Sequence, residues 1–361
     1  MPTFTSEPAV PYYLQNRTAV LLLNLGTPDA PTAEAVRPYL AAFLSDARVV
    51  ELPKAVWQPF LHSTVLPFRA KKSAHGYEKI WLKDGSPLAV YTQRQAQALA
   101  EKLPSHIIVR HAMTYGQPSV SDVMAQLKAE GVSQLLVLPL YPQYAASSSG
   151  AALDKVFHVM LKQRNMMSLR TVRQFYQDAG YIEALRQQIE AYWQQHGKGE
   201  KLLMSFHGIP LAQYEQGDPY PDACHHTARL LADALKLTAN DYIVAFQSRF
   251  GRAKWMTPNT QDLLLSLPKR GITKLDVICP AFVSDCLETM EEIAIAGREQ
   301  FHEAGGTQFH YIPCLNTHEA WIEALADLVK RQLGDWLIAV EQPNSETEAN
   351  TEAITASEPT H

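Results

Sequence analysis

Seven short apolar runs, separated by amphipathic stretches, constrain the fold of this chain more than any other feature of its sequence. The runs lack the strict alternation of a half-exposed strand, and their length fits strands that are buried on both faces, as in a parallel sheet. They lie at 19–25, 107–113, 135–140, 202–206, 242–246, 275–279 and 309–312. The amphipathic stretches predict helices at 181–194, 221–236, 286–303 and 317–332. Because strand and helix alternate throughout, the sequence predicts a doubly wound α/β fold.

The length of 361 residues favours two domains over one, and an apolar fraction of 46% supports a large core. The polar segment 196–200 interrupts the alternation near the middle of the chain and precedes a new apolar run, so it helps to mark a boundary between two α/β halves. The tail at 341–361 is rich in Glu, Ser, Thr, Asn and Pro, and we expect it to be disordered.

Charge and cysteine content exclude several classes of function. A formal net charge of -5 and the lack of a long basic block give no attraction to nucleic acid. The four cysteines contain no C-x-x-C pair, which argues against a zinc ribbon or a thioredoxin-like redox motif and favours a reducing compartment. Residues 1–15 lack the features of a signal peptide, and no apolar stretch approaches the roughly 18–20 residues that span a bilayer. We therefore expect a cytoplasmic protein.

Ligands of open α/β sheets bind beyond the carboxyl ends of the strands, so the residues after the apolar runs are the candidates for a site. Residues 24–28 form a tight Gly-Pro turn without the glycine pattern of nucleotide-binding loops, and no nucleotide cofactor is indicated. An ordinary turn between strand and helix is the favoured interpretation of this segment. Residues 141–150 carry hydroxyls at the start of a helical pattern, where they either hold an anion or cap the helix.

Two strand ends carry stronger candidates. The run at 202–206 is followed by His207, an imidazole at the carboxyl end of a strand that is either structural or catalytic. The run at 242–246 is followed by the donors at 247–249, with Trp255 shortly after. Donors beside an indole fit a flat aromatic ligand that carries carboxylates. A surface arginine beside a half-buried tryptophan is the alternative interpretation.

Carboxylates follow the run at 275–279. Glu288 and Glu292 are four residues apart and would share one face of a helix, with Asp285 near the start of that helix. Like charges at this spacing disfavour an isolated helix, so a cation bound near both carboxylates is one interpretation. A solvated acidic face, or compensation of the helix dipole, is the other.

Taken together, these segments resemble the ferrochelatase family over about residues 19–327. Each segment is weak evidence alone, but the shared order and spacing over most of the chain are specific. The segments are 23–28 (LNLGTP), 85–88 (GSPL), 113–116 (MTYG), 142–144 (PQY), 205–210 (SFHGIP), 247–249 (QSR) with Trp255, and 284–289 (SDCLET).

The resemblance implies two Rossmann-like domains, each a parallel sheet flanked by helices, with a porphyrin in the cleft between them. The implied activity is insertion of ferrous iron into protoporphyrin IX to give protohaem, the last step of haem biosynthesis. We expect the N-terminal domain at 17–175, with an active-site lip at about 53–81. The C-terminal domain is expected at 176–315, and a helix at 316–340 is expected to pack back on the core.

The resemblance also implies roles for single residues. The family's invariant histidine falls on His207 and its essential glutamate on Glu288, and we expect both to act in catalysis and to hold the metal. The expected porphyrin contacts are Leu25, Tyr77, Ser248, Arg249, Trp255 and Phe282. Asp285 and Glu292 are expected in an acidic network that carries protons. The expected substrates are protoporphyrin IX and Fe2+, with no permanently bound cofactor.

The lip segment combines apolar residues with Arg69, Lys71 and Lys72. Such a segment suits a surface that receives an insoluble porphyrin at a membrane, which would place the protein at the periphery of the inner membrane. A covered amphipathic helix is the alternative. We expect a monomer or a weak dimer. The cysteine-rich C-terminal extension that carries an iron–sulfur cluster in some relatives is absent from this sequence, so we expect no cluster.

Three positions depart from the pattern of many relatives. Thr114 stands where many carry Arg or Lys, which puts a propionate or loop contact there in doubt. Cys286 stands where many carry histidine, although bacterial relatives also have cysteine. Ala296 stands where some keep another acid, so a path of carboxylates would be shorter here.

Metal insertion removes two pyrrole protons while a hydrated dication loses its water. A pocket that bends the macrocycle towards its metalated shape stabilises the transition state, and Trp255, Phe282 and the lip would impose that bend. An imidazole accepts protons near neutrality, which favours His207 as the base. Imidazole and carboxylate also suit Fe(II), so His207 and Glu288 are candidate ligands as well, and the order of the two duties stays open.

Three alternatives remain at this stage. A chelatase specific for coproporphyrin would share the same motifs, although the LNLGTP and DCLET variants favour protoporphyrin. A non-catalytic porphyrin or haem carrier would need the aromatic cleft but not His207 opposite Glu288. A chelatase that loads cobalt into a corrin precursor would favour a more basic pocket, and the apolar lip argues against it.

Overall fold

The structure of the protein is a computed structural model that describes residue 4 and residues 17–251 and 253–338. The tail predicted at 341–361, the end of the segment 316–340, and all of residues 1–15 except Phe4 lie outside the described residues.

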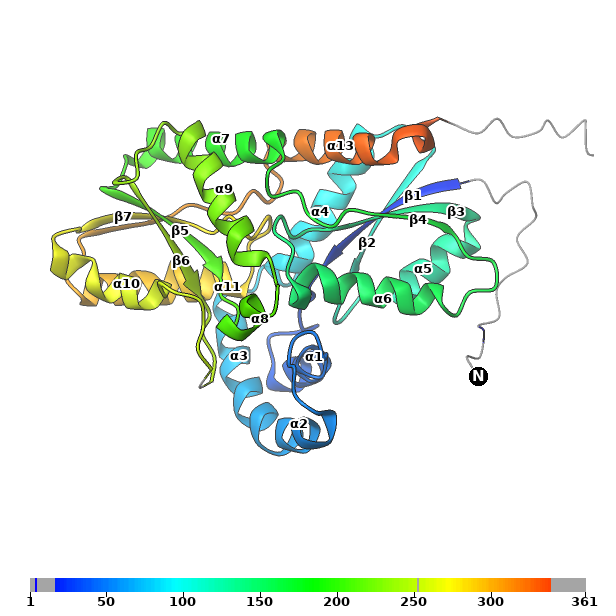
Figure 1. Ribbon diagram of the computed structural model, residues 1–361, viewed down its shortest axis with the longest axis horizontal. Helices are drawn as coiled ribbons and strands as arrows, with labels where there is room; N and C mark the ends of the chain where they lie inside the picture. The colour runs from blue at the N-terminus through cyan, green and yellow to red at the C-terminus, as the bar shows by residue number, and fades with distance from the viewer. Residues whose placement is uncertain (1–3, 5–16, 252, 339–361) are drawn as a thin grey trace, which may run out of the picture.

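Four parallel strands form the first sheet, in the order β2-β1-β3-β4 (Figure 1). The strands are β1 (Arg17–Asn24), β2 (Ile107–Met113), β3 (Val132–Pro139) and β4 (Ser168–Thr171). The helices between them are α4 (Pro87–Lys102), α5 (Val120–Ala129) and α6 (Ala151–Met160), and the π-helical turn η3 (Ala146–Gly150) leads into α6. Every residue of β1 after Arg17 is buried, as expected of a central strand with both faces covered.

The second sheet repeats this arrangement in the order β6-β5-β7-β8. Its strands are β5 (Lys201–His207), β6 (Tyr242–Gln247), β7 (Lys274–Ile278) and β8 (Gln308–Tyr311). The connecting elements are α8 (Leu211–Glu215), α9 (Tyr220–Ala234), α10 (Thr260–Ser266), η4 (Pro268–Arg270), α11 (Leu287–Thr289), η5 (Met290–Gly297) and α12 (Arg298–Glu303). The two sheets therefore share one strand permutation, although the sequence shows no internal repeat.

The predicted α/β class is confirmed, and the seven apolar runs coincide with strands to within a few residues. The strand that the sequence analysis missed is β4. It has only four residues, its two end residues are exposed, and Leu169 is its single apolar residue. A short, half-exposed edge strand carries no apolar run, so the hydrophobic pattern could not reveal it.

One apolar core joins the two sheets. It contains side chains from β1 and β3 together with side chains from β5 and β6. Two helices complete it, α7 (Ala179–His196) and α13 (Glu319–Leu333), which contact each other along the top of the view in Figure 1. Trp321 of α13 is fully buried and packs on Phe175 and Tyr181, with ring centroids 5.7 and 6.0 Å away. The 3-10 turn η6 (Gly334–Leu337) follows α13.

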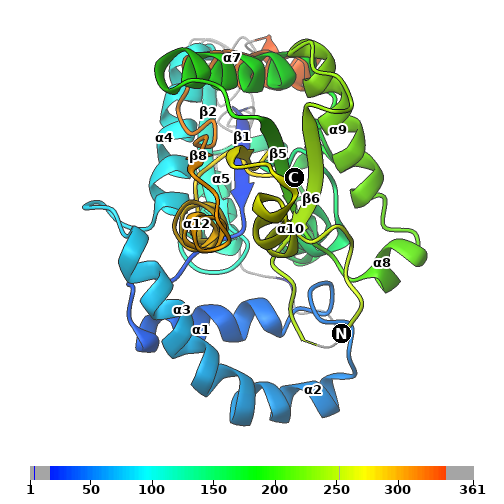
Figure 2. The same ribbon diagram turned by 90° about the vertical axis from the view of Figure 1, so that its left-hand side faces the viewer.

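A group of helices lies to one side of both sheets, at the bottom of the view in Figure 2. It consists of α1 (Ala33–Leu44), α2 (Lys54–Phe60), the π-helix η2 (Leu61–Val65) and α3 (Leu66–Ile80). In the lip, residues 53–81, the outward side chains of Val56, Phe60 and Phe68 are 69%, 51% and 75% exposed. Leu61 and Leu66 point inward into a separate small core. Within the described residues, no helix combines the length and apolar character needed to cross a bilayer.

Candidate active site

His207 is the last residue of β5, and its imidazole is held in one tautomer. The Nδ1 atom lies 2.7 Å from the carbonyl oxygen of Gly208. Because a carbonyl oxygen only accepts hydrogen bonds, Nδ1 carries a proton, and the lone pair of the neutral form of the ring lies at Nε2. The ring of Phe282 lies beside the imidazole, with centroids 6.5 Å apart. This strand end thus presents a base or metal ligand next to an aromatic ring.

Gln247 connects the end of β5 to the segment that carries the carboxylates. It is the parallel partner of His207 in the register of β5 and β6. Its Nε2 donates to the backbone carbonyl of Glu288 at 2.8 Å, and its Oε1 accepts from the hydroxyl of Ser205 at 2.7 Å. The sequence analysis counted Gln247 among the donors for a ligand at 247–249, but it did not predict these bonds to Ser205 and to the backbone of Glu288.

Asp285 is buried, and several donors fix its carboxylate. It accepts from the hydroxyl of Thr289 at 3.0 Å, from the hydroxyl of Tyr311, and from Nδ2 of Asn316 at 2.7 Å. The backbone N–H of Asp285 returns a hydrogen bond to Oδ1 of Asn316 at 2.9 Å. Tyr311 and Asn316 lie far from Asp285 in the sequence, which is why no local motif predicted them. The carboxylate anchors the turn that precedes Glu288.

The helix predicted at 286–303 is present, but it is not a regular α-helix throughout. Leu287–Thr289 and Arg298–Glu303 are α-helical, and the π-helix η5 runs between them from Met290 to Gly297. A π-helix has i→i+5 hydrogen bonds and a wider turn, so the four-residue spacing that puts Glu288 and Glu292 on one face of an α-helix does not apply unchanged. The wider turn directs the Glu292 carboxylate towards the end of β6.

Glu292 is held by three hydrogen bonds at the end of β6. Its carboxylate accepts from the N–H of Ser248 at 2.8 Å, from the hydroxyl of Ser248, and from Nε2 of Gln261. Burial raises the pKa of Glu292, while the Ser248 hydrogen bonds and the His207 imidazolium lower it and the Glu288 carboxylate raises it. Ser248 has a φ of 65°, a costly conformation for a residue other than glycine, so the surrounding bonds must hold it.

Trp255 packs against the residue that follows β5. A Cβ atom on Gly208 would lie 3.3 Å from the indole ring of Trp255 and 2.8 Å from the backbone oxygen of Gln247, so the close approach requires glycine. The indole Nε1 donates to the carbonyl of Phe250 at 2.7 Å, and the two rings meet edge to face. These contacts fix the position of the indole beside the end of β5.

Two arginines, Arg249 and Arg69, lie near the loop that carries Trp255. Arg249 pairs with Asp262 on the surface, with an N–O distance of 3.2 Å. The guanidinium carbon of Arg69, from α3, lies 4.4 Å from the ring centroid of Phe250. The second contact brings the lip against the loop that carries Trp255.

Two of the expected porphyrin contacts, Leu25 and Tyr77, come from the first half of the chain. Leu25 follows β1, is partly buried, and donates its N–H to Oδ1 of Asn24 at 2.9 Å. Tyr77 of α3 is buried. Burial raises the pKa of Tyr77, and the Glu288 carboxylate raises that pKa further. The pKa of Tyr39 is raised by burial and also by Tyr77 and Glu288. Both tyrosines therefore keep their protons.

The three departures from the family pattern have clear surroundings. Thr114 is buried, and its hydroxyl donates to the carbonyl of Asn24 at 3.0 Å. Cys286 is buried, and both burial and the Glu288 carboxylate raise the pKa of its thiol. Ala296 lies in η5 beyond Glu292 and adds no carboxylate.

The match to a protein-family model shows the family to which this chain belongs. The family model described as Ferrochelatase matches residues 17–333, which is most of the chain. The chain belongs to the ferrochelatase family. A relative named Ferrochelatase from Neisseria gonorrhoeae is 65% identical over 333 residues, which cover 92% of this chain and 99% of the relative. Another of that name, from Aromatoleum aromaticum, is 50% identical over 343 residues, 94% of each chain.

Solved structures support the fold of this ferrochelatase-family chain. CbiX, described as the terminal enzyme for biosynthesis of siroheme in denitrifying bacteria, superposes with a TM-score of 0.51 at 15% identity and covers 88% of this chain and 100% of its own. SirB from Bacillus subtilis with Fe3+ has a TM-score of 0.51 at 12% identity, with coverages of 88% and 96%. At these identities the likeness concerns the architecture alone, and it agrees with two parallel sheets flanked by helices.

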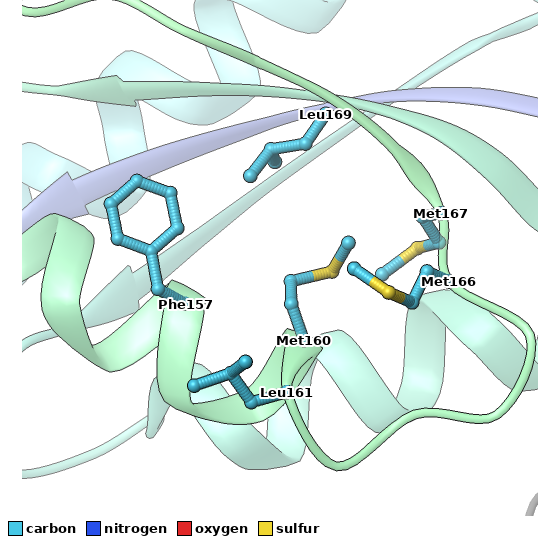
Figure 3. Close-up of a pocket in the computed structure, with 6 residues that line it drawn as sticks. All are labelled: Phe157, Met160, Leu161, Met166, Met167 and Leu169. Atoms are coloured by element: carbon cyan, nitrogen blue, oxygen red, sulfur yellow. The ribbon is translucent and has the colours of Figure 1, made fainter.

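A hollow of about 480 Å³ lies apart from the candidate site residues (Figure 3). It is lined by Phe157, Met160, Leu161, Met166, Met167 and Leu169. These residues lie around the start of β4, at the amino ends of the strands, whereas ligands of such sheets bind beyond the carboxyl ends. Across residues 17–251 and 253–338, no three His, Cys, Asp or Glu side chains are grouped so that they could hold a metal ion.

Proposed function

We propose that the protein is an enzyme that inserts ferrous iron into protoporphyrin IX and releases protohaem, the last step of haem biosynthesis. Its substrates are the porphyrin and Fe2+. One observation carries the proposal. In a ferrochelatase-family chain, the imidazole of His207 lies at the end of β5, and Gln247 ties that strand end to the backbone of Glu288.

His207 accepts a pyrrole proton at Nε2 in this proposal. The hydrogen bond from Nδ1 to Gly208 leaves Nε2 as the basic atom and orients the ring. As two N–H bonds of the macrocycle break and bonds from nitrogen to iron form, two protons leave and one dication enters, so the net charge of the porphyrin centre is unchanged. The same lone pair and the Glu288 carboxylate suit Fe(II) as ligands before the transfer.

The carboxylates take the protons onward in this proposal. The raised pKa of Glu292 suits it to accept a proton from the His207 imidazolium, which lies close enough to lower that pKa. Asp285 mainly positions the turn before Glu288, because both of its carboxylate oxygens already accept hydrogen bonds. The donors are Thr289, Tyr311 and Asn316.

The porphyrin is proposed to lie between the two halves of the chain. Leu25 and Tyr77 would form one wall, and Trp255 and Phe282 would press on the macrocycle from the other side. Ser248 and Arg249 would lie near the propionates, and Arg249 would then exchange its surface partner Asp262 for a propionate. The indole is well suited to bending the ring because Gly208 and Phe250 fix it from two sides.

The lip is proposed to contact a membrane from which the porphyrin arrives. Three outward apolar side chains, Val56, Phe60 and Phe68, support this, with exposed Lys71 and Lys72 nearby to face anionic lipid. The protein would then act in the cytoplasm at the face of the inner membrane, as a monomer or a weak dimer. We also propose domain limits of 17–175 and 176–315, because each range holds one four-stranded sheet.

The experiment is anaerobic incubation of the purified protein with Fe2+ and either protoporphyrin IX or coproporphyrin, with loss of porphyrin fluorescence followed over time. The proposal expects turnover with both components present and a higher kcat/KM for protoporphyrin. A higher kcat/KM for coproporphyrin would overturn the assigned substrate. Tight binding of porphyrin without any turnover would instead identify a carrier.

A further inference from the structure

Gln95 lies in α4, in the first half of the chain, yet its hydrogen bonds go to the second half. Its side chain is fully buried. The Nε2 atom lies 3.1 Å from the carbonyl of Val283, 3.1 Å from the hydroxyl of Ser284 and 2.7 Å from the carbonyl of Asn316. The amide nitrogen carries two hydrogens, so it shares them among three acceptors from two separate segments, and these bonds fix the relative positions of the segments.

These acceptors flank the turn that leads to Glu288. Asn316 holds Asp285 at two points, through its Nδ2 and its Oδ1. Asn316 has a φ of 46°, which lies in the left-handed region, so its backbone conformation needs support from its surroundings. Gln95 supplies part of that support from the other half of the chain.

Another residue of α4 fixes the position of Leu25, an expected porphyrin contact, through Asn24. The hydroxyl of Thr92, one turn before Gln95, accepts from Nδ2 of Asn24 at 2.9 Å. Oδ1 of Asn24 in turn accepts the N–H of Leu25. Because an α-helix is rigid over one turn, Thr92 and Gln95 together set the separation between Leu25 and the turn that carries Glu288.

We infer that Gln95 is a positioning residue for iron insertion, because its amide holds the 283–289 turn at the correct distance from the porphyrin wall. This inference rests on the proposed function. Gln95 contacts neither substrate and acts through the turn. Loss of the Gln95 amide is expected to displace Glu288 relative to the porphyrin while the aromatic contacts remain. The rate of the chemical step should therefore fall more than porphyrin binding weakens.

Gln95→Met tests the inference, and Gln143→Met is its matched control. Gln143 is a second buried glutamine whose Nε2 joins the two halves, but it donates to Thr227 of α9 at 2.9 Å, away from the 283–289 turn. Two readouts are compared on the full chain. Hydrogen–deuterium exchange is followed at the amides of 283–289 and 314–316, and iron insertion is followed as kcat and as KM for the porphyrin.

The expected result for Gln95→Met is exchange in those two segments faster by about tenfold, a kcat lower by about tenfold to a hundredfold, and a porphyrin KM within about twofold of the wild type. Gln143→Met should leave the exchange of both segments and the kcat within about twofold. If Gln95→Met does not fold, Ser284→Ala removes one of the three acceptors and should shift both readouts in the same direction by a smaller factor.

Unchanged exchange in both segments would overturn the inference whatever the turnover. Faster exchange with an unchanged kcat, or equal losses of kcat in the two glutamine variants, would also overturn it. A wild-type protein without turnover overturns the proposed function instead, and the exchange data then still decide whether Gln95 holds the turn.

Discussion

Single residues of the candidate site are held by hydrogen bonds between residues that lie far apart in the sequence. The apolar runs place His207 and the segment of Glu288 beyond the carboxyl ends of strands, where ligands bind, but the roles of both residues come from the family resemblance and stay predictions. Gln95 and Asn316 could not be predicted, because their partners come from other parts of the chain and their own neighbours form no motif. A local pattern can locate the ends of strands, but it cannot show which distant side chain will hold them in place.

The pKa of Glu292 makes a prediction about stability. Because burial raises this pKa, the folded protein binds a proton at pH values where the unfolded chain has already lost it. The free energy of unfolding therefore falls as the pH rises from the ordinary glutamate value of about 4.5 through the folded pKa. In Glu292→Gln this component of the pH dependence should be absent, as measured by urea unfolding between pH 4.5 and pH 8.

Glu299→Gln is the control for that series, because Glu299 is an exposed glutamate in the following helix. Its pH dependence should match that of the wild type. If Glu292→Gln also follows the wild-type curve at every pH, Glu292 does not hold a proton in the way described.

At the scale of elements, the strands were easier to predict than the helix that carries the carboxylates. Long buried strands such as β1 have a continuous apolar pattern, whereas η5 has the composition of an α-helix and reveals its wider turn only in the structure. The difference matters for function, because the π-helix delivers Glu292 to Ser248. Hydrophobic periodicity shows which face of a helix is buried, but it does not show where an α-helix changes into a π-helix.

The lip makes a prediction at this scale. Replacing both Phe60 and Phe68 with Ser removes two exposed aromatic rings without touching a buried side chain. Since burying one Phe side chain is worth about 1.5–3 kcal/mol, binding to vesicles of phosphatidylcholine and phosphatidylglycerol should weaken by about tenfold or more, as measured by co-sedimentation. Phe157→Ser changes an exposed ring on α6 and serves as the control. Equal binding by the double variant and the control would exclude the lip as the membrane contact.

At the scale of the whole molecule, one shared core makes the two sheets depend on each other. The sequence predicts two α/β halves but not that β1, β5 and the ring of Trp321 lie in a single apolar cluster. Shared strand order in the two sheets, without sequence similarity between them, shows that architecture is set by the alternation of elements and not by particular residues.

Trp321→Ala should lower the free energy of unfolding by about 3–5 kcal/mol, because a large ring is removed from a closely packed site between Phe175 and Tyr181. Both sheets should still unfold in one transition, seen as coincident urea curves from circular dichroism and from hydrogen exchange in β1 and β5. Trp321→Phe keeps an aromatic ring and should cost less. Separate transitions for the two sheets would contradict a shared core.

The measurement that tests iron insertion at His207 most directly is an anaerobic assay with protoporphyrin and ferrous iron, run in parallel on the wild type and on His207→Ala. Turnover should occur in the wild type and fall by about a hundredfold or more in the variant, while the porphyrin Kd stays within about twofold. Substantial turnover by His207→Ala would contradict the assigned base, and porphyrin binding without turnover by either protein would contradict the enzyme itself.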